Sequence, residues 1–208
     1  MAKRSDKTRE RIQTVLFMFA VTFVCISVVA GAHLATRDTV ARNESLYLKR
    51  AVAEAAGVEL GRDAVLEWFE ACVRPVTGQD GAVRDYRIVA NGGSDETGLV
   101  CVRDGAGLWG RITAVVGLDR EHVSLTGVTF VEQNETPGLG ARIEEAWFKN
   151  QFKGKTGPFR IVPEKTGSPL PTDMDAITGA TITTTAVRDI LNRLIAASRQ
   201  SNSNGREK

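Results

Sequence analysis

A mostly apolar segment without charged residues, near the N-terminus, constrains this chain more than any other feature. From Ile12 to Thr36 the sequence contains no Asp, Glu, Lys or Arg. About 20 apolar residues in a helix are enough to cross the hydrocarbon core of a bilayer. The segment is also longer than the roughly 7–15 apolar residues of a signal peptide. We therefore expect a retained transmembrane helix over 12–36, with a signal peptide cleaved near Ala30-Gly31-Ala32 as the alternative.

The charges before this segment predict its orientation. Residues 1–11 contain five Lys and Arg but only two acidic residues. Because positive charge is retained on the cytoplasmic side of a membrane, we expect residues 1–11 in the cytoplasm. The chain is then a single-pass protein of the inner (plasma) membrane, with everything after Thr36 on the periplasmic, extracytoplasmic side.

Composition excludes several functions for the rest of the chain. Its 208 residues suffice for one ordinary domain plus accessories. A formal net charge of only +2, with basic residues dispersed among acids, gives no footprint for nucleic acid. The three cysteines lack the spacing of a zinc site, so we expect no metal. Cys72 and Cys101 would face an oxidising compartment, and the sequence leaves open whether they form a disulfide.

The order of periodic segments predicts an α+β fold, with an antiparallel sheet flanked by helices. Helical spacing of apolar residues indicates helices at 44–58, 63–73 and 141–152, and a last one after Thr181. Runs rich in Val, Ile and Thr between turn residues indicate strands. These runs are at 85–90, 98–104, 109–119, 122–133 and 158–164. We expect a helical stalk or packing region over 37–80, a domain over 81–199 and a disordered tail over 200–208.

One glycine-rich segment imitates a nucleotide-binding motif. GAGLWG (105–110) matches G-x-G-x-x-G, but that motif needs a helix after it. The following RITAVVGLD is β-branched and predicts a strand, so we interpret the segment as a turn between strands. Taken alone, Trp109 fits a core residue better than the wall of a pocket.

Two further segments have both a structural and a functional interpretation. In NETPGLGAR (134–142), Gly138 and Gly140 either shape a loop before a helix or let the backbone approach a flat ligand. In DAITGATITTTAV (175–187), Thr181 stands at a helix start. Its hydroxyl either caps the helix or is esterified to a phosphate, which the free N–H groups of a helix N-terminus favour.

The segment Asp175–Thr181 resembles the flavinylation signature D-x-x-[ST]-G-A-[ST] of the FMN-binding domain family. The resemblance implies that a flavin transferase moves FMN from FAD onto Thr181 as a phosphoester. It makes Asp175 the signature acid and assigns phosphate binding and transferase recognition to Thr178, Gly179 and Ala180. By the same resemblance the flavin is lined by Glu135, Thr136, Gly138, Leu139 and Gly140, with Leu108 and Trp109 close by. Thr183, Thr184 and Thr185 match no position of the signature and are read as ordinary helix residues.

GAGLWG and ETPGLG also resemble segments of two members of this family, which are electron-carrying subunits of ion-translocating complexes. The resemblance therefore implies covalent FMN, electron relay rather than free-standing catalysis, and membrane, iron–sulfur and flavin subunits as partners. The short chain favours an Rnf-type electron-transport complex, whereas the GLWG sequence favours a Na⁺-translocating NADH:quinone oxidoreductase. A cofactor-free membrane-anchored scaffold and a flavin domain of a standalone periplasmic reductase are the remaining alternatives.

Overall fold

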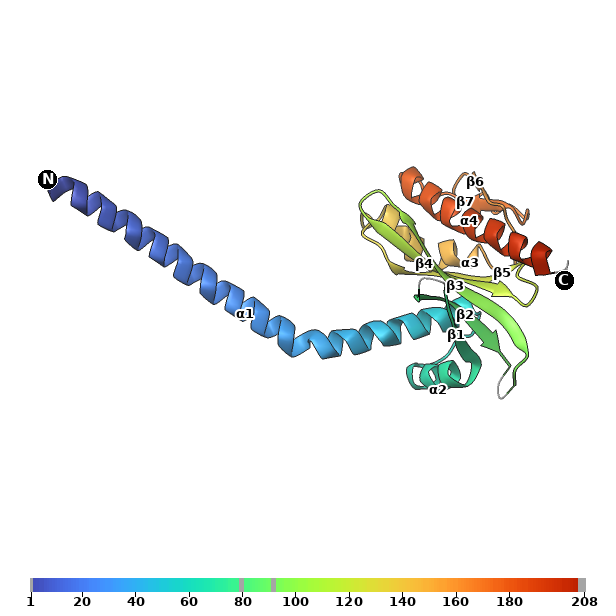
Figure 1. Cartoon of the computed structure of the whole chain (residues 1–208). Coiled ribbons are helices and arrows are strands. Elements are labelled where there is room, and N and C mark those ends of the chain that lie inside the picture. The colour runs from blue at the N-terminus through green and yellow to red at the C-terminus, as the bar shows by residue number, and fades with distance from the viewer. Residues whose placement is uncertain (1, 79–80, 91–92, 206–208) are drawn as a thin grey trace. The chain divides into compact units, whose positions relative to one another are not determined.

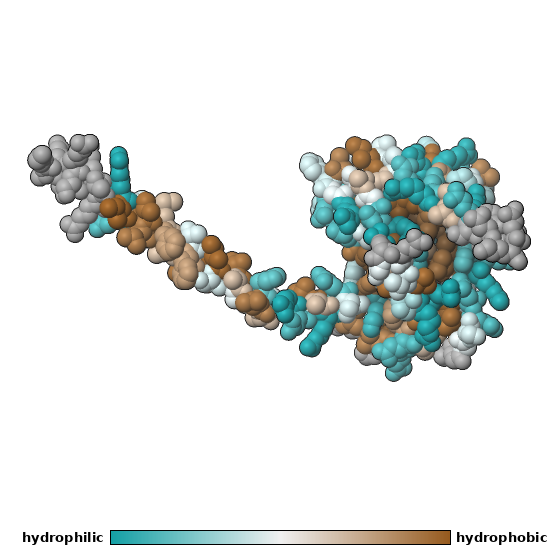
Figure 2. All heavy atoms as spheres, in the orientation of Figure 1, coloured by the Kyte–Doolittle hydropathy of each residue, from teal (hydrophilic) through white to brown (hydrophobic). Residues whose placement is uncertain are grey.

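The computed structural model describes residues 2–78, 81–90 and 93–205, and it divides the chain into two compact units, Met1–Ser45 and Leu46–Lys208. The first unit is helical and belongs to α1 (Ala2–Ala55). The part of α1 from Arg11 onward contains a stretch long and apolar enough to cross a membrane. The apolar side chains of this stretch are exposed (Figure 2). Such exposure suits a lipid environment, because lipid tails can cover these side chains where water cannot.

Helix α1 continues through both N-terminal segments that the sequence predicts as helices. It ends at Ala55, where Gly57 adopts the left-handed conformation (φ 80°). The Gly57 N–H donates to the Glu54 carbonyl and the Val58 N–H to the Ala53 carbonyl, at 3.0 and 2.9 Å. This is a Schellman motif, which satisfies the carbonyls that a helix end leaves without partners.

The second unit is built on a five-stranded antiparallel sheet in which the strands follow one another in chain order (Figure 1). A short helix, α2 (Arg62–Cys72), precedes the sheet. After the sheet come two short helical segments, a parallel pair of short strands and the long helix α4 (Thr181–Gly205). The sheet strands are β1 (Val73–Thr77), β2 (Val83–Val89), β3 (Glu96–Ala106), β4 (Arg111–Asp119) and β5 (Leu125–Glu132). The later elements are η1 (Gly140–Glu144), α3 (Ala146–Asn150), β6 (Arg160–Val162) and β7 (Asp173–Asp175).

Alternating side chains of β4 divide the core between the two faces of this sheet. Ile112 and Val116 pack with Phe148 of α3 and with the apolar stripe of α4. Val115, one position along the strand from Val116, packs on the opposite face with Val52 near the end of α1. Successive strand residues point to opposite faces, so one β-branched strand supplies both cores. The expected α+β fold, an antiparallel sheet flanked by helices, is what the structure contains.

Three local predictions differ from the structure. Strand β1 has no counterpart among the predicted strands, and it contains Pro75, because an edge strand tolerates a residue without an N–H. The helix predicted over 141–152 is broken at Glu145, whose backbone is extended (φ −63°, ψ 142°). The Glu145 carboxylate accepts hydrogen bonds from Arg142 and Trp147 there, which compensate for the break. The short strand β7 has no counterpart among the predicted strands. The disordered tail over 200–208 stays a prediction: α4 is described to Gly205, and residues 206–208 lie outside the described residues.

Candidate functional site

A pocket of about 240 Å³ lies at the N-terminal end of α4. Three segments that are distant in the sequence form it: the β3–β4 turn, the loop after β5 and the start of α4. Eight of the twelve residues predicted for the site line this pocket. They are Leu108, Glu135, Thr136, Leu139, Gly140, Gly179, Ala180 and Thr181, and the structure adds Ile182 and Thr183.

The start of α4 leaves hydrogen-bond donors free beside this pocket. The turn before the helix is closed by the Ala180 N–H, which donates to the Ile177 carbonyl at 3.0 Å. Thr184, fully buried, accepts from the Ile177 N–H at 3.1 Å and donates to the Ala180 carbonyl at 2.9 Å. In the described chain the backbone N–H groups of residues 181–183 donate no hydrogen bond. Together with the helix dipole, such free N–H groups favour an anion.

The Glu135 carboxylate joins the three segments of the pocket. It is only 5% exposed. Its Oε1 accepts from the backbone N–H groups of Leu108 and Trp109, at 2.8 and 3.2 Å, and its Oε2 accepts from the Thr183 hydroxyl at 2.5 Å. A buried carboxylate is costly unless donors surround it, and these three donors satisfy it. Glu135 thus fixes the β3–β4 turn and the first turn of α4 to the loop between them.

Glycines allow the three segments of the pocket to lie this close to one another. A Cβ at Gly140 would lie 2.6 Å from the Thr183 Oγ1 and 2.7 Å from the Glu135 Cβ, and a Cβ at Gly107 would collide with the Glu135 Oε1. Gly179 has φ 80°, and a Cβ there would approach the Leu139 side chain to 3.0 Å. Only a residue without a Cβ fits between these segments.

Large apolar side chains surround the mouth of the pocket. Leu108, Leu139 and Ile182 are about half exposed, at 50%, 42% and 56%. Trp109 is 69% exposed and donates from its indole N–H to the Thr136 hydroxyl at 3.1 Å. The interpretation of Trp109 as a core residue is therefore wrong. Its backbone N–H donates to Glu135, and its indole ring lies at the surface, where it donates to Thr136.

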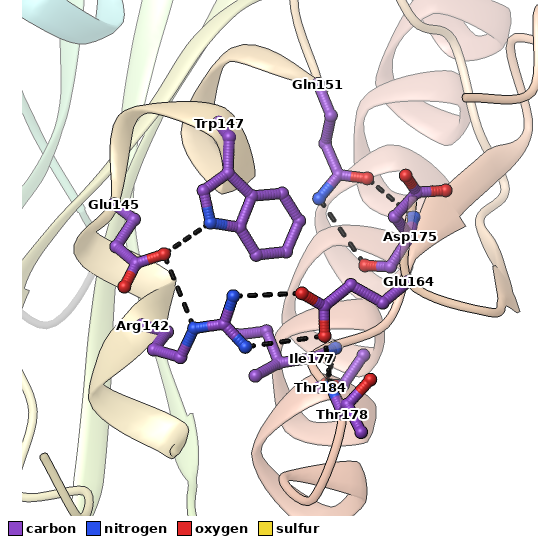
Figure 3. A network of polar contacts seen from close by, with 9 residues as sticks. All are labelled: Arg142, Glu145, Trp147, Gln151, Glu164, Asp175, Ile177, Thr178 and Thr184. Atoms are coloured by element: carbon purple, nitrogen blue, oxygen red, sulfur yellow. Dashed lines mark hydrogen bonds and ion pairs between the residues drawn. The ribbon is translucent and has the colours of Figure 1, made fainter. Parts of the chain in front are cut away.

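Four predicted site residues do not line the pocket. Trp109 lies at the rim as described. Gly138 is a left-handed turn residue (φ 76°) with open space around it. Thr178 is exposed, and its N–H donates to Glu164 at 2.8 Å. The Asp175 N–H donates to the Gln151 side chain at 2.6 Å (Figure 3).

The interpretation of Thr183 and Thr184 as ordinary helix residues is wrong. Both are buried, at 1% and 0% exposure. The Thr183 hydroxyl donates to Glu135 in the loop after β5, and the Thr184 hydroxyl holds the turn that leads into α4. The only sign of this role in the sequence is the run of threonines. A buried hydroxyl needs a polar partner, and the sequence does not show where that partner lies. That partner for Thr183 is Glu135, 48 residues earlier.

The described residues contain no group of His, Cys, Asp and Glu that would hold a metal ion. Cys72 and Cys101 are both buried and both free. Burial and the nearby Asp85 raise the pKa of the Cys101 thiol to about 12, so it stays protonated. The site therefore has the chemistry of a hydroxyl at a helix N-terminus, beside an apolar pocket.

Comparison with known proteins shows what this part of the chain is similar to. Residues 107–196 match the model of the FMN-binding domain. The C subunit of the Na(+)-translocating NADH-quinone reductase of Yersinia pestis is 34% identical over 95 residues, which are 42% of this chain and 36% of that protein. Its counterpart in Vibrio vulnificus is 25% identical over 85% of this chain and 87% of its own length. The G subunit of the Na(+)-translocating ferredoxin:NAD(+) oxidoreductase complex of Acetobacterium woodii is 37% identical over 91 residues, 43% of each chain.

A solved structure agrees in fold. The crystal structure of NqrC from Shewanella oneidensis superposes with a TM-score of 0.66, over 76% of this chain and 95% of that one, at 20% sequence identity. The region that matches the family model contains all three segments of the pocket. Over residues 107–196 the chain is therefore similar to the FMN-binding domain family.

Proposed function

We propose that this chain is a membrane-anchored flavoprotein that carries FMN as a phosphoester on Thr181 and relays electrons as one subunit of an ion-translocating complex. The observation that carries the proposal is the position of Thr181. It is the first residue of α4, it is exposed, and it lines the pocket of the segment that matches the FMN-binding domain.

The residues present fit an esterified phosphate. The free N–H groups at 181–183 are donors for its oxygens, and the helix dipole favours its charge. Gly179 and Ala180 present no long side chain beside the Thr181 hydroxyl. The exposed apolar rim of Leu108, Trp109 and Leu139 offers a surface on which a flat ring excludes water.

Attachment is a balanced group transfer. The Thr181 Oγ forms a bond to the FMN phosphorus of FAD, the pyrophosphate bond of FAD breaks, and AMP leaves with the hydroxyl proton. A separate flavin transferase supplies the catalytic groups, and Asp175 belongs to the segment that this enzyme recognises. Bound FMN supplies one- and two-electron transfer, while the protein holds and orients it. A covalent bond also prevents its loss on the extracytoplasmic side, where we place the folded unit because of the basic residues before the apolar segment.

For the complex we favour an Rnf type. The aligned region takes up the same 43% of this chain and of the Acetobacterium woodii protein, which agrees with two chains of similar length. The alternative is the C subunit of a Na⁺-translocating NADH:quinone oxidoreductase, and the Vibrio vulnificus relative, which aligns over most of both chains, supports it. Purification of the tagged chain from its own membranes distinguishes them, because an Rnf-type complex contributes ferredoxin-like iron–sulfur subunits and the alternative contributes a quinone-reducing assembly.

Intact mass spectrometry tests the attachment. The full-length chain, coexpressed with a flavin transferase, is expected to gain the mass of FMN less one water. Thr181→Ala removes this adduct and Thr181→Ser retains it. Thr185→Ala is the matched control, because Thr185 lies on the same helix outside the pocket. An unmodified wild-type chain, or an adduct that persists in Thr181→Ala, refutes the proposal, and a wild-type chain with no flavin fluorescence on a denaturing gel supports the scaffold alternative.

A further inference from the structure

A largely buried carboxylate outside the pocket holds the turn that precedes Thr181. Glu164 follows β6, and its side chain is only 12% exposed. Its Oε2 accepts from the Thr178 backbone N–H at 2.8 Å (Figure 3). The Arg142 guanidinium donates to both of its oxygens, from Nη2 to Oε1 at 2.9 Å and from Nη1 to Oε2 at 3.3 Å. One carboxylate thus connects η1, the segment after β6 and the turn before α4.

The surroundings keep this connection in one geometry. Arg142 is held on its other edge by the Glu145 carboxylate, at 3.4 Å from Nε, and lies 5.4 Å from the centre of the Trp147 ring. Hydrogen bonds from Arg142 and from the side chain and backbone of Thr178 lower the pKa of Glu164 to about 2. Glu164 is therefore an anion throughout the physiological pH range. Forked pairing of a guanidinium with a carboxylate also fixes their orientation.

Two carboxylates bracket the proposed attachment residue. Glu135 holds Thr183, two residues after Thr181, and Glu164 holds Thr178, three residues before it. Between these two points lies Gly179, whose left-handed conformation a glycine leaves easily. If the Glu164 bond is lost, the Thr178 N–H loses its partner, and the nearest hydrogen bond on the preceding side is that of Ile177 to Thr184.

We propose that Glu164 and Arg142 are positioning residues for the modification of Thr181, which hold residues 178–181 in the conformation that a flavin transferase accepts. Neither residue lines the pocket, so they act through Thr178 and not through contact with FMN. The inference rests on the proposed function. When only a fraction of molecules has the competent conformation, the apparent affinity for the transferase falls by that fraction, while the rate at saturation is kept.

The test measures modification kinetics of the purified full-length chain with a flavin transferase, FAD and Mg²⁺, using intact mass as the readout. For Glu164→Gln we expect a KM for the protein substrate about tenfold higher and an unchanged kcat, since loss of a charge-assisted hydrogen bond opens the turn by about that factor. Hydrogen exchange at the Thr178 amide should accelerate about tenfold as well. Asp85→Asn is the matched control, because it breaks the Arg103–Asp85 ion pair (2.6 Å) that joins β3 to β2.

Each outcome decides between the two proposals. A wild-type chain that gains no flavin refutes the proposed function, while the exchange measurement still reports on the turn. A wild-type chain that is modified, with Glu164→Gln modified at the same KM, refutes the positioning role. An equal rise in KM for Asp85→Asn also refutes the positioning role, because the rise then reflects general destabilisation of the fold. If Glu164→Gln does not fold, Arg142→Lys is the second variant, which keeps the Glu164–Thr178 bond and should give a smaller rise in KM.

Discussion

Replacement of Thr183 by valine tests whether the buried carboxylate of Glu135 organises the pocket. Valine has nearly the shape of threonine, so the change removes the 2.5 Å hydrogen bond to the Glu135 Oε2 without opening a cavity. Glu135 is 5% exposed and keeps only the donors from Leu108 and Trp109 on its other oxygen. A hydrogen bond to a charged group contributes about 1.5–3 kcal/mol, so we expect the free energy of unfolding to fall by about 2 kcal/mol.

For a chain of this size that loss corresponds to a decrease in Tm of about 4–8 °C. The measurement is thermal or urea unfolding of the detergent-solubilised full-length chain, followed by circular dichroism. Thr185→Val is the control: Thr185 is half-buried, and no hydrogen bond of its hydroxyl is found in the described part of the chain, so its replacement should change stability by less than about 0.5 kcal/mol. Equal stabilities of the two variants would show that the Glu135–Thr183 bond does not hold the start of α4.

Three further predictions concern acid stability, a turn and the thiols. Glu164 has a pKa of about 2 in the folded chain, below its unfolded value, so the stability it contributes is complete above about pH 5 and is lost as pH falls toward 2. The difference in urea midpoint between wild type and Glu164→Gln should therefore shrink over that range. A constant difference contradicts this prediction. Gly179→Ala should lower stability by about 1 kcal/mol or more, because φ is 80° and the new Cβ approaches Leu139; a neutral result in urea unfolding would show that the turn tolerates a side chain. Cys101, with its pKa raised to about 12, and buried Cys72 should resist alkylation at pH 8 in the native chain and react in urea, and rapid native labelling of either, seen by intact mass, would disprove their burial.

Local patterns predict those elements whose stability is local or periodic. Strands β2, β3, β4 and β5 follow from the sequence because β-branched runs between turn residues fit a sheet with two buried faces. Helix α4 follows because its apolar stripe recurs at helical spacing. The division at Glu145 does not follow, since it depends on contacts with Arg142 and Trp147 that a helix pattern does not contain.

The candidate site, too, could be predicted from the sequence only in part, because some of its contacts join residues that are far apart along the chain. The sequence groups eight residues that the structure brings to one pocket, because a resemblance links segments that periodicity alone does not connect. Without the resemblance, local patterns misplace Trp109 and Thr183, because the position of each depends on where Glu135 lies in space. The sequence assigns no role to Glu164 or Arg142, whose importance arises only from the Thr178 N–H that they reach through the fold.

Pro75 has a consequence for contacts between copies of this chain. It lies in β1, the first strand of the sheet, and pairs with Tyr86 on the inner side only. A strand from another molecule that docks along β1 meets a position with no N–H to offer, so the ladder of hydrogen bonds that seeds fibrils is interrupted there. Two copies of the chain that meet along β1 therefore cannot continue one unbroken ladder of hydrogen bonds across that edge.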